Sequence, residues 1–386
     1  MRGLLIIADI SGYTRFLTEA ELDHAHGIVT ELLNAIISAI QAPFKVSSIE
    51  GDAVFMYGEL PEDVFGQVVL ESVESLYTAF AGALETMVLN TTCSCNACAN
   101  INTLGLKIVM HCGEFVKTIV GDRETLAGPE VIAVHRLLKN RVTETTGIAD
   151  YLLVTQACVD ELDLTRIVAP WIEHTESYEH IGEVRGYVSS LAEVWAFARR
   201  QSSNLVSEGE AWVTARGFSV APPPIVWDYL IDPRKRTRWM QVEGNVVEGE
   251  VDGRVGAGSE YHCAHGGGEI SVFSVLDSRP NEYITLTTPF TPGTALRYTH
   301  YLIPSGTGTR LVTYAVAPTS ADTGETVPEL SGSHTAEVVL AIMQEPLDRL
   351  VGLADDAASR LPATNRRRSL VDVPQSSVPE KGGGPR

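Results

Sequence analysis

Two aspartates interrupt runs of residues that otherwise have the composition of buried strands. Asp9 follows Leu-Leu-Ile-Ile-Ala in residues 4–13, and Asp52 precedes Ala-Val-Phe in residues 49–55. Removing a carboxylate from water is costly unless a partner compensates its charge, and a divalent cation is a common partner. The sequence therefore predicts that Asp9 and Asp52 hold a metal ion together. The alternative is that both stand at strand ends and are satisfied by backbone donors.

Four segments around these aspartates resemble motifs of class III nucleotide cyclases. They are Ala-Asp-Ile-Ser-Gly-Tyr-Thr-Arg-Phe at 8–16, Gly-Asp-Ala-Val at 51–54, Leu-Lys-Ile-Val-Met-His-Cys-Gly-Glu at 106–114, and Gly-Pro-Glu-Val-Ile-Ala-Val-His-Arg-Leu at 128–137. Four matches in the family's order, within about the first 200 residues, are more specific than any one of them. The chain thus resembles a divergent branch of this family.

The resemblance implies a chemistry and an assembly. In the family, two carboxylates hold two Mg²⁺ or Mn²⁺ ions that act on a purine nucleoside triphosphate, and an arginine stabilises charge on the transferred phosphorus. Asp9 and Asp52 match the metal ligands, the Ile10 carbonyl is a further candidate ligand, and Arg136 matches the catalytic arginine. The family's carboxylates and arginine come from different protomers, which implies a head-to-tail homodimer.

Other positions depart from the family pattern. Ser48 and Thr125 occupy the positions of the side chains that read the purine, and Ile132 replaces the asparagine that orients the ribose. Isoleucine can neither donate nor accept a hydrogen bond, so one positioning contact would be lost. Lys45, Lys139 and Asn140 could supply substitute polar groups.

Charge and hydropathy restrict the partners. The 386 residues carry a formal net charge of -20, and such a field repels nucleic acid and anionic membranes. Asp9 interrupts the N-terminal apolar run too early for a signal peptide, and no later run approaches the roughly 20 apolar residues of a membrane span. We therefore expect a cytoplasmic protein.

Three cysteines lie close together at positions 93, 95 and 98. In a cytoplasmic protein Cys93, Cys95 and Cys98 serve as thiols or metal ligands more readily than as disulfides. They could share Zn²⁺, which requires four ligands in a structural site, or a thiolate-bound iron–sulfur cluster. The fourth ligand is missing locally. The open candidates are His111, Cys112, Cys158 and a cysteine of a second protomer, and the alternative is a reduced loop without metal.

Hydrophobic periodicity predicts an α+β fold. Strand-like runs and amphipathic helical segments alternate through residues 1–200, as in the ferredoxin-like core of a class III cyclase domain. The predicted strands are 3–10, 43–49, 52–58, 104–112, 115–121, 150–155, 171–180 and 186–197, and the predicted helices are 19–41, 62–90 and 128–140.

A second domain is predicted at 208–358, after a polar linker at 201–207. A strand at 209–219 leads into Pro222-Pro223-Pro224, a helix-start signal, and candidate strands then follow at hairpin spacing up to 317. An amphipathic helix at 333–358 closes the domain. The pattern resembles the START-related, polyketide-cyclase-like helix-grip fold, and residues 359–386 have the composition of a disordered tail.

A helix laid across a curved sheet encloses space for side chains or for an apolar ligand. We expect Trp227 and Trp239 to line a cavity that binds an apolar small molecule. Three hypotheses remain for the whole chain. It is an active nucleotide cyclase regulated by such a ligand, a cyclase-like domain that binds metal and nucleotide without turnover, or an inactive dimerisation scaffold joined to a carrier or sensor of hydrophobic ligands.

Overall fold

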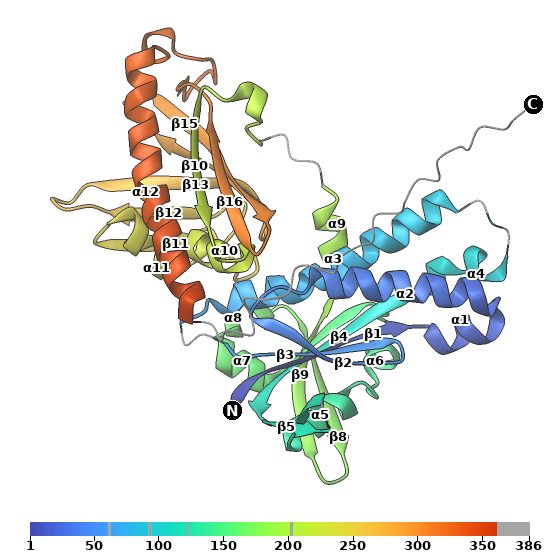
Figure 1. Cartoon of the computed structure of the whole chain (residues 1–386). Coiled ribbons are helices and arrows are strands. Elements are labelled where there is room, and N and C mark those ends of the chain that lie inside the picture. Colours follow the sequence, from blue (N-terminus) through green and yellow to red (C-terminus); the bar gives the residue numbers. More distant parts are fainter. Residues whose placement is uncertain (61–62, 92, 94, 122, 201–203, 361–386) are drawn as a thin grey trace, which may run out of the picture.

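The computed structural model describes residues 1–60, 63–91, 93, 95–121, 123–200 and 204–360. Residues 201–203 of the predicted linker and residues 361–386 of the predicted tail lie outside this part. Two sheets dominate the structure, one in each half of the chain, and helix α3 passes between them (Figure 1). The predicted α+β class is confirmed. No helix in the described part combines the length and the apolar character needed to cross a bilayer.

The N-terminal sheet has seven strands in the order β2-β3-β1-β4-β7-β9-β8. The two central strands, β1 and β4, are antiparallel to each other, and β4 pairs in parallel with β7. This arrangement is the predicted ferredoxin-like core. The bounds are β1 Arg2–Ser11, β2 Phe44–Glu50, β3 Ala53–Gly58, β4 Gly105–Glu114, β7 Tyr151–Thr155, β8 Ile172–Tyr178 and β9 Gly182–Ser190.

Residues 4–8 of strand β1 are all apolar because both faces of the strand are covered there. Leu4, Ile6 and Ala8 belong to the core beneath helices α2 (Leu22–Ala39) and α3 (Gly66–Asn90), whereas Leu5 and Ile7 belong to the core beneath α5 (Pro129–Leu137). This alternation is the two-residue period of a strand. Asp9 lies just before the end of this buried strand.

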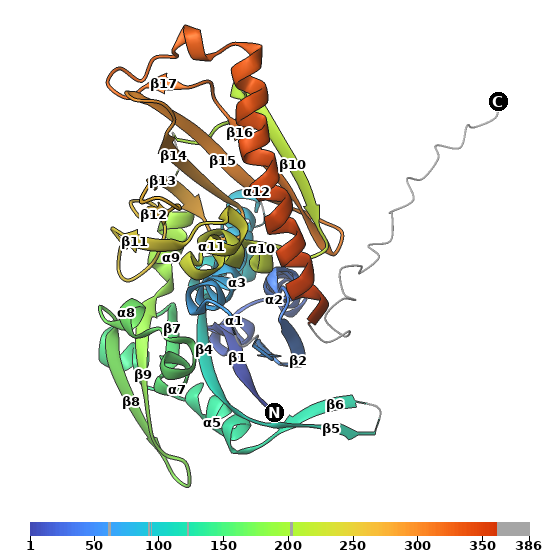
Figure 2. The same ribbon diagram turned by 90° about the vertical axis from the view of Figure 1, so that its left-hand side faces the viewer.

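Several elements differ from the predictions. The predicted helix 19–41 is α2, and the structure adds a short helix before it, α1 (Tyr13–Glu19), that was not predicted. The predicted strand 186–197 is the second half of β9 followed by helix α9 (Leu191–Ala198). Strands β5 (Val116–Val120) and β6 (Arg123–Ala127) form a separate hairpin that projects from the domain (Figure 2). The remaining short elements are α4 Asn96–Ala99, η1 Ile101–Thr103, α6 Val142–Thr146, α7 Gln156–Leu162 and α8 Thr165–Val168.

The C-terminal sheet is antiparallel throughout, in the order β10-β16-β15-β14-β13-β12-β11, with β17 paired to β15. The long helix α12 (Ser333–Arg360) packs along it, as expected for a helix-grip domain (Figure 2). The first strand begins later than predicted, because residues 208–210 form the short helix η2. The other bounds are β10 Val213–Ser219, α10 Pro223–Ile231, α11 Pro233–Met240, β11 Gly244–Glu248, β12 Glu260–Ala264, β13 Ile270–Arg279, β14 Tyr283–Pro289, β15 Thr294–Ser305, β16 Gly308–Ala315, β17 Thr319–Ser320 and η3 Pro328–Leu330.

The N-terminal half of α3 joins the two domains through polar side chains. The amide of Gln67 exchanges two hydrogen bonds with the backbone of Val255, at 2.7 and 2.8 Å. Glu74 accepts two hydrogen bonds from the guanidinium of Arg254, at 2.6 and 2.8 Å. Between these contacts, Glu71 accepts a 2.8 Å hydrogen bond from the indole nitrogen of Trp227. The two domains are therefore joined by hydrogen bonds that buried polar side chains of α3 make, as well as by the connecting segment.

Candidate functional site

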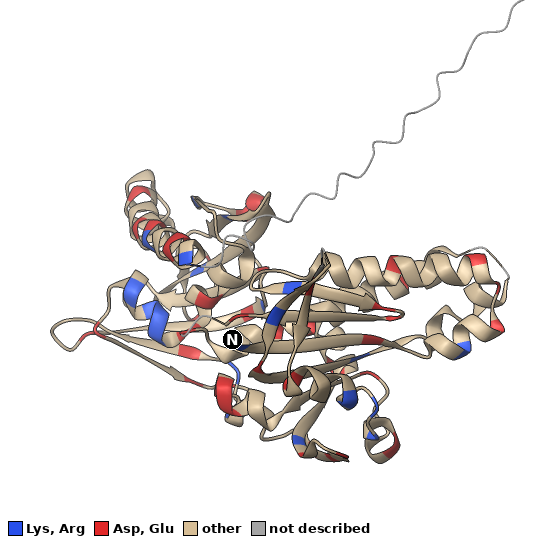
Figure 3. Cartoon of the chain, turned by 60° about the horizontal axis from the view of Figure 1, so that its bottom comes forward, with Lys and Arg blue, Asp and Glu red and all other residues tan. Residues whose placement is uncertain are grey.

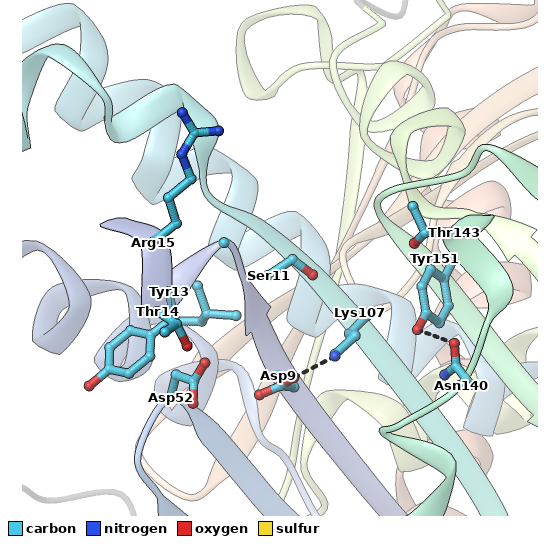
Figure 4. Close-up of a pocket in the computed structure, with 12 residues that line it drawn as sticks. Asp9, Ser11, Tyr13, Thr14, Arg15, Asp52, Lys107, Asn140, Thr143 and Tyr151 are labelled. Atoms are coloured by element: carbon cyan, nitrogen blue, oxygen red, sulfur yellow. Dashed lines mark hydrogen bonds and ion pairs between the residues drawn. The ribbon is translucent and has the colours of Figure 1, made fainter. Parts of the chain in front are cut away.

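The two predicted metal ligands lie side by side where strand β1 ends and strand β3 begins (Figure 4). Asp9 stands opposite Ala53 in the β1–β3 pairing, and Asp52 immediately precedes that residue. The backbone N–H of Ile10 donates to the carbonyl of Asp52 at 3.1 Å. Gly51 adopts a positive φ of 68° in the β2–β3 turn, a conformation that glycine adopts without steric cost. Strand pairing and this turn therefore bring the aspartates together.

Both aspartates line a pocket of about 460 Å³ at the start of α1. Its lining comprises residues 9–15, Asp52, Lys107, Asn140, Thr143 and Tyr151. Most of this lining is polar. Ile10, whose carbonyl was the predicted additional ligand, belongs to it.

The two carboxylates have different electrostatic surroundings. The ammonium of Lys107 lies 2.9 Å from Asp9 and also donates to the carbonyl of Leu138 at 3.3 Å. Among the described residues, no cationic side chain forms an ion pair with Asp52. Burial, together with the neighbouring charge of Asp9, raises the pKa of Asp52 above its ordinary value, and its backbone hydrogen bond and Lys107 oppose this only in part. The site thus holds more negative charge than one lysine compensates.

Arg136 does not reach this pocket within one chain. It is exposed on α5, where it lines a second pocket of about 590 Å³ together with Ile132. In that pocket His111 bonds Glu130 at 2.6 Å and Thr155 at 2.9 Å. The predicted arginine and the predicted carboxylates therefore lie at separate places on the chain.

The substitute polar groups differ in position. Asn140 lines the aspartate pocket, but its side chain already donates to Leu137 and accepts from Tyr151 and Val142. Lys139 is exposed at the end of α5 and is not part of the lining, and Lys45 lies over the ring of Tyr57.

The positions that read the purine in the family also lie outside this lining. Ser48 on β2 donates to Glu50 at 2.9 Å, and Thr125 on β6 stands opposite Thr118. The single chain therefore offers no side chain for purine recognition at these two positions of the aspartate pocket.

The cysteine cluster forms, but without the fourth ligands considered from the sequence. Cys93, Cys95 and Cys98 gather around His24 of α2. Cys112 and Cys158 are instead buried in the core of the N-terminal domain, where burial raises the pKa of Cys158 well above its ordinary value. His111 lines the second pocket. His24 was missed because its partners lie about seventy residues away in the sequence.

The two tryptophans expected to line a cavity are buried, and each makes a hydrogen bond. Trp227 points its indole nitrogen at Glu71 in the other domain, and Trp239 donates to the carbonyl of Tyr229 at 2.7 Å. A different residue stands out beside them. Arg236, only 1% exposed, lies between the rings of Trp239, Tyr261 and Phe273, at 4.5–4.9 Å from their centroids. Among the described residues, its guanidinium nitrogens have no partner at full hydrogen-bond geometry, and the hydroxyl of Tyr298 interacts with the same guanidinium.

Comparison with known proteins identifies the family. A region of 167 residues is 30% identical to "Uncharacterized protein Rv2561/Rv2562" of Mycobacterium tuberculosis (strain ATCC 25618 / H37Rv), covering 42% of this chain and 74% of that protein. The chain belongs to the family of this mycobacterial protein. Residues 29–146 also match the family "Protein of unknown function (DUF2652)". Residues 220–352 match "Activator of Hsp90 ATPase homolog 1-like protein", which confirms the predicted START-related helix-grip domain.

The N-terminal region is similar in structure to solved nucleotide cyclases. One is a bacterial light-regulated adenylyl cyclase, with 14% identity and a TM-score of 0.37, and the similarity covers 52% of this chain and 56% of that one. Another is the guanylyl cyclase Cya2, with 11% identity and a TM-score of 0.39, covering 49% of this chain and 92% of that one. The chain thus spans little more than half of the light-regulated enzyme.

Proposed function

We propose that this protein binds a divalent cation and a purine nucleoside triphosphate in the pocket of Asp9 and Asp52. The observation that carries the proposal is the pair of adjacent carboxylates of which only Asp9 has a cationic partner. A cation beside Asp52 would compensate the burial of this carboxylate and the neighbouring charge of Asp9, which together raise the pKa of Asp52. The oxygen-rich lining suits Mg²⁺ or Mn²⁺, which prefer carboxylate and carbonyl ligands.

The residues present fit such an ion. Asp9, Asp52 and the carbonyl of Ile10 would hold it, and a bound Mg²⁺ or Mn²⁺ supplies charge neutralisation for a triphosphate. Lys107 has a separate role, because its ammonium forms an ion pair with Asp9 and offers a charge to phosphate oxygens at the same pocket. The lysine also competes with the metal ion for Asp9. We therefore expect the protein to bind the metal ion with only moderate affinity in the absence of nucleotide.

A second copy of the chain would complete the site. Arg136 is exposed on α5 and lies away from the aspartates, as expected if it serves the pocket of a partner protomer. The projecting hairpin supports an assembly, since Val116, Ile119 and Val120 of β5 are all more than half exposed. A run of exposed apolar side chains on a projecting element is typical of an interaction surface.

The experiment is incubation of the full chain with ATP or GTP and Mn²⁺, with nucleotide binding and cyclic product both measured. Product would establish a cyclase, whereas metal-dependent binding without product would establish the hypothesis of a cyclase-like domain that binds metal and nucleotide without turnover. Absence of both would refute the proposal. If product forms, mixing Asp52→Ala with Arg136→Ala protein should restore about a quarter of the activity, because random pairing leaves one complete site in half of the dimers.

The C-terminal domain is a second candidate binding module, and Arg236 favours an amphipathic ligand with an anionic head. The aromatic rings around this buried guanidinium offset only part of its desolvation cost, and a bound carboxylate would offset more of it through paired hydrogen bonds. We expect a fatty acid to raise the melting temperature more than the alcohol of equal chain length. This preference should disappear in Arg236→Met. Equal effects of acid and alcohol on the native chain would contradict an anionic head at Arg236.

A further inference from the structure

Four potential metal ligands converge beyond the end of α3, and none of them belongs to the lining of the aspartate pocket. They are His24 in the first turn of α2, Cys93 after α3, Cys95 at the N-cap of α4, and Cys98 within α4. Nδ1 of His24 lies 3.2 Å from Sγ of Cys95, 3.8 Å from Sγ of Cys93 and 4.0 Å from Sγ of Cys98. All four ligand atoms lie within 4.8 Å of one another.

These distances match a tetrahedral ion. A Zn²⁺ with Zn–S bonds of about 2.3 Å and a Zn–N bond of about 2.05 Å holds its nitrogen about 3.6 Å from each sulfur. The three observed nitrogen–sulfur distances bracket this value. We propose that His24, Cys93, Cys95 and Cys98 form a structural Cys₃His zinc site. Four protein ligands complete the coordination shell, so the site is closed and has no position for a substrate.

The local backbone supports the proposed site. The N–H of Cys98 donates to Sγ of Cys95 at 3.4 Å, a contact that stabilises a thiolate. The carboxylate of Glu21, the residue before α2, accepts from the N–H groups of Asn96 and Ala97 at 3.2 and 3.1 Å. The loop is therefore fixed against the start of α2, which carries His24.

Packing does not account for the cluster. Free cysteine is among the most buried residue types in proteins, yet Cys93 is exposed and Cys95 and Cys98 are only half-buried. His24 is also exposed. Four such groups gain little from burial, whereas a shared Zn²⁺ accounts for both their residue types and their spacing.

The zinc site would hold in place a segment that packs against the lining of the aspartate pocket. The chain passes from α4 through η1 to Thr103, whose carbonyl would lie 2.9 Å from a Cβ placed at Gly12. Gly12 itself lines the pocket, between β1 and α1. Zinc would thus hold the α3–β4 connection against the α1–α2 turn and fix the residues that follow Asp9.

The test is the metal content of tag-free full-length protein. We expect about one Zn²⁺ per chain, and after chelation and reconstitution with Co²⁺ we expect tetrahedral d–d bands and thiolate-to-cobalt charge transfer. His24→Ala, at an exposed position outside the hydrophobic core, should reduce bound zinc at least tenfold and weaken the thiolate-to-cobalt band. The matched control is His26→Ala, an exposed histidine on the same helix, which should retain the metal.

Three results would overturn the proposal. In the first, the protein contains no zinc, and the thiols of Cys93, Cys95 and Cys98 all react freely in the presence of added Zn²⁺. In the second, His24→Ala binds as much zinc as the native protein. In the third, the protein contains iron and labile sulfide in place of zinc. Undiminished zinc in His24→Ala would show a thiolate site that does not use the imidazole, and iron with labile sulfide would show an iron–sulfur centre in place of zinc.

Discussion

Glu71, on the buried polar face of α3, should make the contact between the domains sensitive to pH. Its carboxylate accepts hydrogen bonds from Gln67 and Trp227, both at 2.8 Å. Burial raises its pKa from 4.5 to about 7, and the hydrogen bond from Gln67, the charge of Arg254 and the bond from Trp227 oppose that rise only in part. The carboxyl group therefore changes charge near neutral pH while enclosed between the two domains.

The sign and size of the effect follow from this shift. The folded chain holds the Glu71 proton more tightly than the unfolded chain, so the free energy of unfolding falls as pH rises from 4.5 to about 7. For these two pKa values the linkage relation gives a loss of about 2.5 kcal/mol between about pH 5 and about pH 8. Glu71→Gln preserves the side-chain length and removes the ionisation.

Urea denaturation of both proteins, followed by tryptophan fluorescence, measures this quantity. Between about pH 5 and about pH 8 the free energy of unfolding of the native chain should fall by about 2.5 kcal/mol relative to that of Glu71→Gln. Glu31→Gln, at an exposed position of α2, controls for the loss of one charge. A difference that stays constant across this range would refute the argument.

Three further predictions concern other contacts. Arg254→Met leaves the buried carboxylate of Glu74 unpaired and should lower the free energy of unfolding by about 3 kcal/mol in urea denaturation, whereas Arg216→Met at an exposed position should change it by less than about 0.5 kcal/mol. Lys107→Met removes the competing ammonium from Asp9 and should tighten Mn²⁺ binding about tenfold by calorimetry, and weaker binding would contradict the competition. Ile119→Asp places a charge on a side chain that is 76% exposed and should convert a dimer to monomer in analytical ultracentrifugation, and an unchanged dimer would exclude the hairpin from the interface.

The sequence predicted the main sheets because their signals are local. The apolar run at residues 4–8 of β1 required cover on both faces, and helices α2 and α5 supply it. Asp9 and Asp52 were predicted to meet, and the β1–β3 register and the turn at Gly51 do bring them to one pocket. Metal binding there stays a prediction.

The errors occur where the local signal is ambiguous. Residues 191–198, Leu-Ala-Glu-Val-Trp-Ala-Phe-Ala, are almost wholly apolar, and a short run of this kind suits a strand or a helix equally. Helix α1 has only seven residues and no side-chain cap, and it begins immediately after Gly12, whose positive φ of 84° turns the chain out of β1.

The domain contact and the cysteine cluster depend on tertiary structure. Gln67, Glu71 and Glu74 recur at helical spacing on α3, and such a polar stripe ordinarily faces solvent, but here it faces the second domain. Acidic residues occur in both domains, so composition does not single these out (Figure 3). His24 likewise reaches its cysteines only through folding, although a cluster with three local ligands was itself a signal that a fourth was needed.

The central claim is tested most directly by calorimetric titration of Mn²⁺ into the full chain with a non-hydrolysable purine nucleoside triphosphate, for the native protein and for Asp52→Asn. The variant keeps the size of the side chain and removes the charge that the metal would compensate. We expect Mn²⁺ affinity to fall at least tenfold in Asp52→Asn and to stay unchanged in the control Asp23→Asn, at an exposed position of α2. Equal Mn²⁺ affinity in the native protein and Asp52→Asn would contradict a metal site at this pair of aspartates.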